Sequence, residues 1–364
     1  MTSLKERDLA GPGIGSYDEL AHVLPGDYRQ LLDHKETMRA LYAAKRLIED
    51  RLCEKLNLTL VQVPLIVDRE SGVNDYLDRD GSRTPVSFHV ANDRDLHPID
   101  AEVVQAATKW KRLALAQFGM RPGEGLLTDM RAVRKDYFLD HDHSAYVDQW
   151  DWERAILPEQ RTLTYLHNVV KAIWSVLKEA ETMLHQRWPA LADPRFTLLP
   201  DEIEVIRAED VLAEFPDLPR KERETRLLQE HPAVFIQGIG WPLADGLPHE
   251  LRAADYDDWT LNGDILVWNP VTRRRHELSS MGIRVTKESL RSQLELSGQL
   301  DFLELPYHRA IVEDRVPLSV GGGIGQSRTM MLLLRKAHLG EVSVSVWPRI
   351  LRELCAQRGI TVLE

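Results

Sequence analysis

The sequence predicts an α+β fold in which a mostly antiparallel sheet is flanked by helices. Two observations favour this class: helical patterns come in blocks, and the short strand candidates between them neighbour one another as in hairpins. The 364 residues are 43% hydrophobic, which is enough for a sizeable core in one large domain or two modest ones. No internal repeat or low-complexity tract divides the chain.

Four segments have the apolar spacing of helices. Residues 34–57 predict a long amphipathic helix, and residues 159–188 keep steps of three and four over roughly six turns, which is the pattern of a packed helix. A further helix is predicted over residues 100–118, and a short apolar one over residues 329–334. The inner stripe of the helix at 100–118 would contain Val103, Ala107, Trp110 and Leu113.

The strand candidates are short. Residues 58–67 are rich in β-forming residues, and Pro64 within them predicts a strand at a sheet edge or an interface. The other predicted strands are residues 86–90, 126–133, 144–152, 233–236, 264–268 and 342–347. Glycines and prolines near the start predict a loosely ordered extension over residues 1–33, so that the main domain would be residues 34–364.

Charge and composition disfavour several classes of protein. A net charge of −11 and a pI near 5.7 argue against a surface that binds nucleic acid through its phosphates. Cys53 and Cys355 lie far apart and have no metal-ligand spacing, which indicates thiols in a reducing compartment. No apolar run has the length of a membrane span, and residues 1–25 lack the apolar core of a signal peptide. We therefore expect a cytoplasmic protein without a nucleic-acid or membrane partner.

A glycine-rich segment at residues 321–328, Gly-Gly-Gly-Ile-Gly-Gln-Ser-Arg, is the most informative motif. Its glycines let the backbone come close to another group, and Arg328 just inside a helix start is placed to hold a polyphosphate. The segment is not a Walker loop, because no Gly-Lys-Ser/Thr follows, and its spacing does not fit the Rossmann fingerprint. It predicts an ATP site of another architecture.

Polar residues on a predicted strand indicate an amino-acid site. Gln149 and Asp151 share one face of residues 144–152, since side chains alternate along a strand. An amide beside a carboxylate suits the ammonium group of an α-amino acid. The alternative is a solvated sheet face, which two tryptophans on the opposite face disfavour. Arg134, at the end of the preceding strand candidate, could reach the same site.

Three other polar clusters contain residues of types found in functional sites. Residues 255–264 contain four acids, and Asp264 stands before an apolar strand, where its carboxylate needs a partner such as an ammonium or Mg²⁺. Residues 277–284 place an acid, a hydroxyl and an arginine around a glycine. Residues 140–143, Asp-His-Asp-His, have metal-ligand spacing, but their place in a loop between strands predicts an exposed polar turn.

Seven motifs, in order along the chain, resemble the ammonia-dependent (type A) asparagine synthetase family. They are residues 109–112 (Lys-Trp-Lys-Arg), 123–126 (Gly-Glu-Gly-Leu), 146–153 (Tyr-Val-Asp-Gln-Trp-Asp-Trp-Glu), 255–259 (Asp-Tyr-Asp-Asp-Trp), 261–270 (Leu-Asn-Gly-Asp-Ile-Leu-Val-Trp-Asn-Pro), 277–284 (Glu-Leu-Ser-Ser-Met-Gly-Ile-Arg) and 321–328. The resemblance runs from about residue 34 to the C-terminus. It implies a fold like the catalytic cores of class II aminoacyl-tRNA synthetases and a homodimer built on the first helix and strand, with Pro64 at the interface.

The resemblance also implies a reaction. The side-chain carboxylate of aspartate would attack the α-phosphorus of MgATP to give β-aspartyl-adenylate and pyrophosphate, and ammonia would then displace AMP. Arg134 would hold the α-phosphate, while Arg328 and Mg²⁺ near Glu277 would hold the rest of the triphosphate. Asp75 would take a proton from ammonium. The other implied residues are Lys111, Gln149, Asp151, Asp257, Asp264 and Ser280 for aspartate, and Arg284 and Gly323 for ATP, with Arg252 in support.

The chain departs from the family pattern at several positions. Tyr137 stands where the family has a glutamate, Ala106 where a serine is expected, and Trp241 before Pro242 where glycine and lysine are usual. Asn74 replaces a usual glutamine beside Asp75.

These departures keep two alternatives open. One is a paralogue that adenylates a related carboxylic acid or uses another nitrogen nucleophile. The other is a non-catalytic amino-acid sensor, which the retained phosphate-binding arginines Arg134 and Arg328 disfavour. The source of ammonia, the role of the N-terminal extension and regulation stay open.

Overall fold

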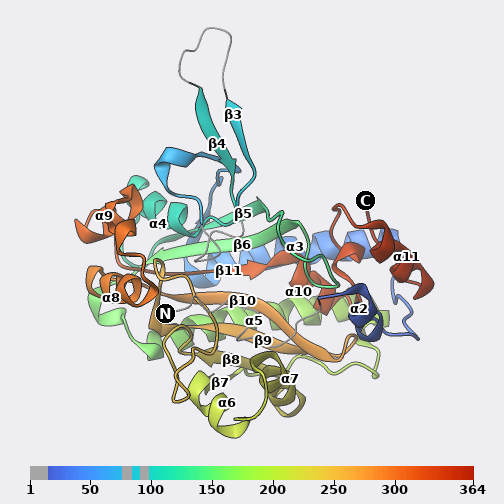
Figure 1. Cartoon of the computed structure of the whole chain (residues 1–364). Coiled ribbons are helices and arrows are strands. Elements are labelled where there is room, and N and C mark those ends of the chain that lie inside the picture. Colours follow the sequence, from blue (N-terminus) through green and yellow to red (C-terminus); the bar gives the residue numbers. More distant parts are fainter. Residues whose placement is uncertain (1–14, 76–83, 91–97) are drawn as a thin grey trace.

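An eight-stranded sheet forms the centre of the protein (Figure 1). The computed structural model describes residues 15–75, 84–90 and 98–364. The strand order is β1–β5–β6–β11–β10–β9–β8–β7. The strands are β1 (Leu58–Leu60), β5 (Gly125–Val133), β6 (Tyr146–Ala155), β7 (Glu204–Arg207), β8 (Ala233–Gln237), β9 (Asp257–Asn269), β10 (Arg274–Arg284) and β11 (Ser319–Gly325).

Most neighbouring strands run antiparallel. Only the two edge pairs differ, because β1 is parallel to β5 and β7 is parallel to β8. The five inner pairs are antiparallel. The predicted α+β fold with a mostly antiparallel sheet flanked by helices is confirmed.

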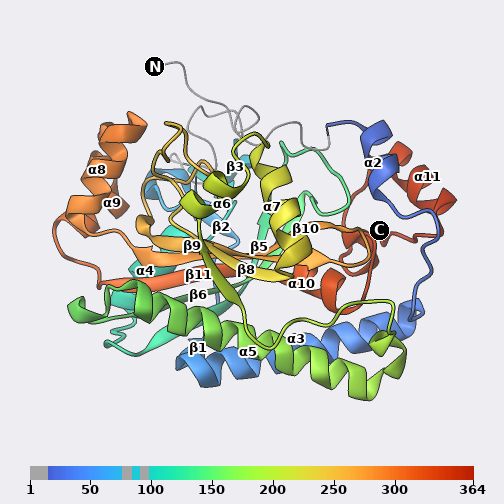
Figure 2. The same ribbon diagram turned by 90° about the horizontal axis from the view of Figure 1, so that it is seen from below.

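Two long helices cover one face of the sheet. α3 (His34–Leu56) and α5 (Leu163–Arg187) lie side by side beneath it in Figure 2. Their spacing by three and four puts apolar side chains on one stripe, which packs against Trp150 and Trp152 of β6 in the main hydrophobic core. The predictions for both helices are confirmed. Because side chains alternate along β6, Gln149 and Asp151 point to the face opposite the tryptophans.

Shorter helices surround the opposite face. α6 (Ala208–Glu214) and α7 (Arg220–Glu230) close a second apolar cluster against β8 and β9. α8 (Lys287–Ser297) and α9 (Pro306–Val312) pack around Trp259 at another end. α4 (Thr108–Gln117) lies on this face against β5, β6 and β11, whereas α10 (Gln326–Leu333), which follows β11 directly, packs with α3 and α5 in the main core. The polar residues of the sheet lie among these elements.

A separate three-stranded sheet corrects one helix prediction. Its order is β2 (Ile66–Asp68), β4 (Ile99–Val103) and β3 (Ser87–Val90), and it projects from the body in Figure 1. The helix predicted over residues 100–118 is therefore wrong in its first part, where β4 pairs with two strands. Val103 matched the helical stripe of α4 but belongs to the end of this strand.

The segment at residues 58–67 is also divided between two sheets. β1 is an edge strand of the large sheet, and β2 belongs to the small one. Pro64 lies between them, where it interrupts no strand pairing. The prediction of one strand is wrong, and the prediction of an edge position is confirmed for β1.

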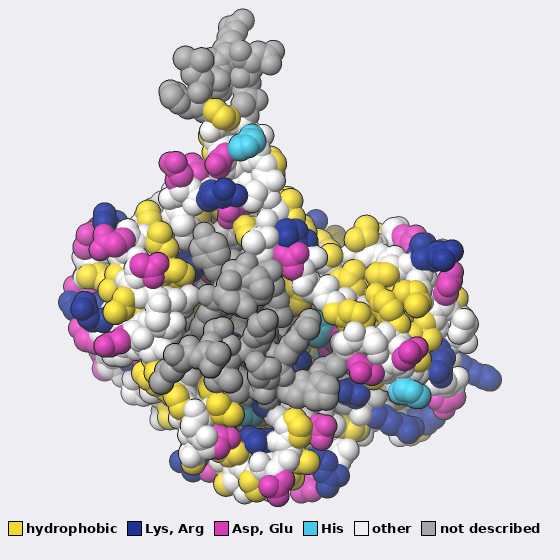
Figure 3. Space-filling view, viewed as in Figure 1, with side chains coloured by type: hydrophobic (Ala, Val, Ile, Leu, Met, Phe, Trp, Pro, Cys, Tyr) yellow, Lys and Arg dark blue, Asp and Glu magenta, His cyan; other side chains and the backbone are white. Residues whose placement is uncertain are grey.

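The predicted strand at residues 342–347 is absent from the structure. Val344 and Val346 are 61% and 72% exposed in an extended loop before α11 (Arg349–Gln357). Alternating valines indicated a strand, but no strand of the described residues pairs with this loop. In the space-filling view of Figure 3, apolar side chains gather on the right, on the side where Figure 1 places α2 and α11.

Part of the predicted N-terminal extension packs on the body. Residues 17–23 form α2 (Tyr17–Val23), whose Leu20 and Val23 belong to the main core, and α2 contacts α11. The division of the chain at residue 33 stays a prediction. Within the described ranges, no helix is long and apolar enough to cross a membrane.

Candidate active site

The glycines of β11 make room for polar side chains of β6. Gly323 pairs with Asp151, and Gly325 pairs with Gln149. A Cβ atom at Gly323 would lie 2.7 Å from Asp151 Oδ1 and 2.9 Å from Gln149 Oε1, closer than such atoms can approach. The predicted close approach of this backbone is therefore to side chains of the neighbouring strand. Contact between Gly323 and ATP stays a prediction.

Lys111 fixes Asp151 on the sheet. Its buried ammonium group donates to Asp151 Oδ1 at 2.8 Å, to the carbonyl of Gly322 at 3.0 Å and to that of Trp152 at 3.2 Å. These contacts use all three of its protons. Asp151 Oδ2 is buried and accepts no hydrogen bond from the part of the chain that the structure describes. One carboxylate oxygen is thus held and the other is available beside Gln149.

Arg284 is an internal counter-ion. Its Nε lies 3.0 Å from both carboxylate oxygens of Glu153, its Nη2 lies 2.7 Å from Glu153 Oε2, and its Nη1 pairs with Asp257. Ser319 adds a hydrogen bond to Glu153 at 2.7 Å. Since Arg284 is 2% exposed and already pairs with two carboxylates, this geometry disfavours its predicted contact with ATP. It holds β6, β9 and β10 together.

Asp264 has a partner that the sequence had not assigned to it. Its Oδ1 accepts hydrogen bonds of 2.6 Å from Arg252 Nη2 and from the hydroxyl of Ser280. Arg252 Nη1 also donates to Ser280 Oγ at 3.0 Å. Burial raises the pKa of Asp264 to about 7, although the Arg252 charge opposes this. The predicted need for an ammonium or Mg²⁺ is met here by a guanidinium.

Arg134 and Arg328 lie at the two ends of one row of side chains. Arg134, just after β5, donates from Nε to the carbonyl of Gln105 at 3.0 Å and lies 5.9 Å from the centroid of the Tyr137 ring. That ring stacks on His143 with a centroid separation of 6.4 Å and an angle of 15°. His143 Nε2 is 3.3 Å from Arg328 Nη2. Tyr137 and His143 thus link the two arginines.

Arg328 also reaches the carboxylate predicted to hold Mg²⁺. Arg328 extends from α10. Its Nη1 lies 3.7 Å from Glu277 Oε1 and donates to the Glu277 carbonyl at 3.4 Å. On the other side of Glu277, Arg275 Nη2 lies 3.4 Å from Oε2. Burial alone would raise the pKa of Glu277, but the charges of Arg328 and Arg275 hold it below its usual value.

Residues 140–143 are not the exposed polar turn that was predicted. Asp140, His141 and Asp142 are buried beside Arg328. His143 Nδ1 lies 3.0 Å from both oxygens of Asp140 and 2.9 Å from Asp142 Oδ1. Burial alone would lower the pKa of His143, but the two carboxylates raise it to about 9. The loop position was a misleading signal, because other segments pack over it.

Asp75 is buried at the edge of this region. Burial raises its pKa, and the nearby ammonium of Lys109 opposes the shift. Neither oxygen accepts a hydrogen bond of ordinary geometry from the described residues, although the Thr108 hydroxyl lies close enough to lower its pKa. Asn74 Oδ1 fixes the local backbone by accepting from the N–H groups of Gln105 at 2.9 Å and Asp75 at 3.0 Å. Among the described residues, the carboxyl group of Asp75 thus keeps acceptor capacity for a ligand.

A buried triad stands behind Asp75, and sequence reasoning missed it. Lys109 Nζ pairs with Asp255 Oδ2 at 2.9 Å, and His308 Nε2 lies 3.0 Å from the same oxygen. Lys109 is two residues from Lys111 and Asp255 two from Asp257, so the motifs contained both. Nothing in the sequence pointed to His308, which α9 supplies.

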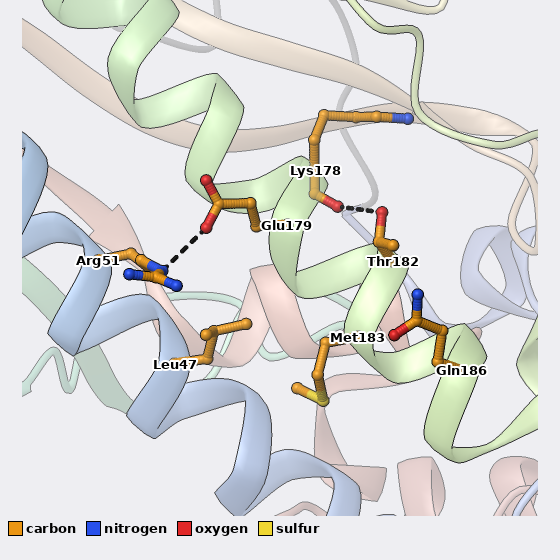
Figure 4. Close-up of a pocket in the computed structure, with 7 residues that line it drawn as sticks. All are labelled: Leu47, Arg51, Lys178, Glu179, Thr182, Met183 and Gln186. Carbon is orange, nitrogen blue, oxygen red and sulfur yellow. Dashed lines mark hydrogen bonds and ion pairs between the residues drawn. The ribbon is translucent and has the colours of Figure 1, made fainter.

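Most of the predicted residues thus gather on one face of the sheet, Lys111 and Arg328 reach it from α4 and α10, and Asp75 and Arg134 come from its border. A groove of about 380 Å³ lies elsewhere, between α3 and α5 (Figure 4). In it Arg51 Nε pairs with Glu179 Oε2 at 3.0 Å, and Leu47 and Met183 supply apolar walls. Since α3 and α5 cover the opposite face of the sheet, this groove is separate from the candidate site.

Known proteins match almost the whole chain. The family model described as aspartate–ammonia ligase matches residues 35–359. The chain belongs to the aspartate–ammonia ligase family. A protein of that name from Clostridium tetani (strain Massachusetts / E88) is 44% identical over 341 residues, which cover 94% of this chain and 97% of that protein. Another from Bacillus cereus (strain B4264) is 45% identical over 333 residues, covering 92% and 99%. The suspected family is confirmed.

Solved structures of lower identity show the fold. The asparaginyl-tRNA synthetase of Entamoeba histolytica in complex with asparaginyl-adenylate has a TM-score of 0.62 and 14% identity, and the match covers 85% of this chain and 66% of that chain. The enzyme from Pyrococcus horikoshii complexed with asparaginyl-adenylate has a TM-score of 0.59 and 15% identity, with coverage of 86% and 70%. The predicted likeness to class II synthetase cores is confirmed for the fold.

Proposed function

We propose that this chain makes L-asparagine from L-aspartate, ATP and ammonia through a β-aspartyl-adenylate. The family assignment and relatives that match over nearly their whole length support this function. The observation that carries the proposal is the row of contacts that joins Arg134 to Arg328 on the face that also holds Asp151. Two anionic reactants can meet only where cations surround them.

In the first step, the β-carboxylate of aspartate attacks the α-phosphorus of ATP, and the bond to pyrophosphate breaks. The α-ammonium of aspartate binds Asp151 Oδ2 and Gln149, which fixes the direction of its side chain. Arg134 then neutralises the α-phosphate, and Arg328 neutralises the departing pyrophosphate. The stable placement of Asp151 by Lys111 supports this role, because the acceptor is positioned before the substrate arrives.

Mg²⁺ would be held by Glu277. Its carboxylate is kept ionised by flanking arginines, and Mg²⁺ commonly binds one or two protein carboxylates together with substrate phosphates, so the residues fit. When bound, the ion would screen the charge of the triphosphate.

In the second step, ammonia attacks the β-carbonyl carbon of the adenylate, and the carbon–oxygen bond to AMP breaks. Ammonia must be neutral to attack, and ammonium predominates near neutral pH. Asp75 accepts the proton that ammonium loses. Its burial and the absence of ordinary hydrogen bonds to its oxygens from described residues support this role.

Replacing Lys109 with methionine is expected to move the acidic limb of the pH profile of asparagine formation to higher pH. Lys109 lowers the pKa of Asp75, and Asp255, which would lose this partner, raises it. Both effects of the substitution therefore raise the pKa of Asp75, which must be ionised to accept a proton. The measurement is kcat against pH. Lys109→Arg keeps the charge and should keep the profile, whereas an unmoved limb in Lys109→Met contradicts the role of Asp75.

The paralogue alternative is not favoured. The two relatives described above carry the name aspartate–ammonia ligase at 44% and 45% identity. The bulk of Trp241 is explained by packing, because its ring contacts that of Trp259 edge to face at 5.2 Å. Tyr137 fills the space between Arg134 and His143.

The test of the proposed function is pyrophosphate release from MgATP, measured with aspartate and with other dicarboxylic acids, with and without ammonium. Release that depends on aspartate, with asparagine as the product when ammonium is present, supports the proposal. Faster release with another acid, or aspartate-dependent release that yields no asparagine with ammonium, contradicts it.

The predicted homodimer has a surface suited to it. β1 is an edge strand, and Tyr42 of α3, Leu60 of β1 and Leu65 are apolar and more than half exposed. A second copy that covers this surface would bury these side chains. The predicted cytoplasmic location stays a prediction.

Leu60→Glu is expected to convert the dimer to a monomer, because a carboxylate in an apolar interface must lose its hydration. Sedimentation measures the mass. Leu198→Glu is the matched control, since Leu198 is 55% exposed and Leu60 is 54% exposed. A wild-type protein that sediments as a monomer, or a Leu60→Glu protein that stays dimeric, contradicts the predicted interface.

A further inference from the structure

The buried loop at residues 140–143 brings together four side chains that can bind metals. One carboxylate oxygen each of Asp140 and Asp142 and one ring nitrogen of His143 lie within 4.8 Å of one another. His141 extends the cluster, because its Nδ1 is 3.7 Å from Asp140 Oδ1 and 3.8 Å from Asp142 Oδ1. None of these four groups is assigned to a substrate, although His143 lies in the row between Arg134 and Arg328.

We propose that this loop is a binding site for a divalent transition-metal ion such as Zn²⁺, distinct from the Mg²⁺ that accompanies ATP. Ligands adjacent around a tetrahedral Zn²⁺ lie about 3.4 Å apart, since each is about 2.1 Å from the ion. The distances from the carboxylates to His143 Nδ1 are slightly shorter, at 2.9 and 3.0 Å, and those to His141 Nδ1 slightly longer. Small side-chain rotations would place an ion among them.

The unused nitrogen of His141 is the second observation that points to a ligand. His141 is 4% exposed, and its Nδ1 is buried without a hydrogen bond to any residue that the structure describes. This nitrogen faces two carboxylate oxygens across distances too long for hydrogen bonds. A buried polar atom without a partner is unfavourable, and a cation shared with these carboxylates would give His141 Nδ1 a partner.

His276 offers another ring nitrogen to the same carboxylate. Its Nε2 donates to the carbonyl of Arg328 at 2.9 Å, since a carbonyl can only accept. In the neutral ring, a proton on Nε2 leaves a lone pair on Nδ1. This Nδ1 lies 3.9 Å from Asp142 Oδ2. Two acceptors facing each other inside the protein favour a positive ion near them.

The backbone holds the loop in place before an ion arrives. Asp140 Oδ1 accepts from the N–H groups of Asp142 and His143, both at 2.9 Å, which leaves Oδ2 for a ligand. Imidazole nitrogens with carboxylates suit Zn²⁺ or Co²⁺, whereas Mg²⁺ prefers oxygen ligands alone.

The site would also position Arg328. The Asp142 carbonyl accepts from Arg328 Nε at 3.2 Å, and His143 Nε2 faces Arg328 Nη2. An ion that orders the loop would therefore order this guanidinium. This consequence for catalysis rests on the proposed function, but the metal site itself does not.

The test is metal binding by the full chain after chelator treatment, in a Cys53→Ser background because a half-buried thiol also binds Zn²⁺. Calorimetry should give about one equivalent of Zn²⁺ with a dissociation constant of about 1 µM or tighter in the presence of excess Mg²⁺. Co²⁺ should bind at the same site and produce visible absorption. An absence of saturable Zn²⁺ binding would overturn the proposal, whether or not the chain makes asparagine.

Variants assign the binding to this loop. Asp142→Asn and His141→Gln should each weaken Zn²⁺ binding about tenfold or more, while His231→Gln, a change of a surface histidine paired with Glu204, should not. Zn²⁺ should raise the unfolding temperature of the wild type more than that of His141→Gln. The unfolding transition of the variant itself shows that it is folded. Affinity unchanged in both loop variants would overturn the proposal.

Discussion

Arg328→Ala is expected to reduce aspartate-dependent pyrophosphate release by about 10³-fold while leaving aspartate binding nearly unchanged, because a preorganised charge in a polar site contributes mainly to the transition state. Arg328 reaches Glu277 and His143 but makes no contact with Asp151 or Lys111 that the structure records. The separation of the two effects follows from that placement. Calorimetry with aspartate and a pyrophosphate assay measure them independently.

Two controls sharpen this result. Arg315→Ala removes an exposed arginine that pairs with Glu313, and it should leave both quantities unchanged. Arg328→Lys keeps the charge but not the planar fork, so it should recover only part of the rate. An equal loss of aspartate binding and pyrophosphate release in Arg328→Ala would contradict the assignment of this residue to the phosphates.

Arg284→Met is expected to cost about 3–5 kcal/mol of unfolding free energy, because it leaves two buried carboxylates without their shared cation. Glu153 and Asp257 are both buried, and Arg284 pairs with each. Urea denaturation measures the loss. Arg309→Met is the matched control, since its pair with Glu304 is largely exposed and should contribute at most about 1 kcal/mol.

The pairing of Arg284 with Glu153 has a pH dependence of definite sign. Burial alone would raise the pKa of Glu153, but Arg284 holds it below the ordinary value of 4.5. The pairing therefore stabilises the fold above about pH 4.5 and is lost as the pH falls through the lower pKa. Adding Glu153→Gln to Arg284→Met should recover part of the stability. A loss in Arg284→Met no larger than in Arg309→Met would refute the proposed role.

Sequence reasoning succeeded where a pattern was local and uninterrupted. Helices α3 and α5 followed from unbroken spacing, and the alternation along β6 placed Gln149 and Asp151 together on the correct face. Sequence reasoning failed where one pattern of residues was compatible with both a helix and a strand. Val103 fitted both a helical stripe and a strand, and only pairing with β2 decided between them. The glycines of β11 concealed a strand because strands seldom contain so many.

The site was predicted mainly through motifs, and its internal partnerships were not. Arg284 and Glu153 lie 131 residues apart, and no local spacing connects them. His308 likewise has no sequence signal that links it to Asp255, because the contact depends on how α9 packs. The burial of residues 140–143 depended on distant segments, such as Leu339, whose N–H donates to the carbonyl of His141 at 2.9 Å.

The pairing of Gly323 with Asp151 and of Gly321 with Glu153 has an evolutionary consequence. A methyl group at either glycine would collide with a charged neighbour, so this part of the pocket floor tolerates almost no variation. Diversification toward other acids or amines would have to arise in the segments that close over the sheet, while the strands beneath them stay unchanged.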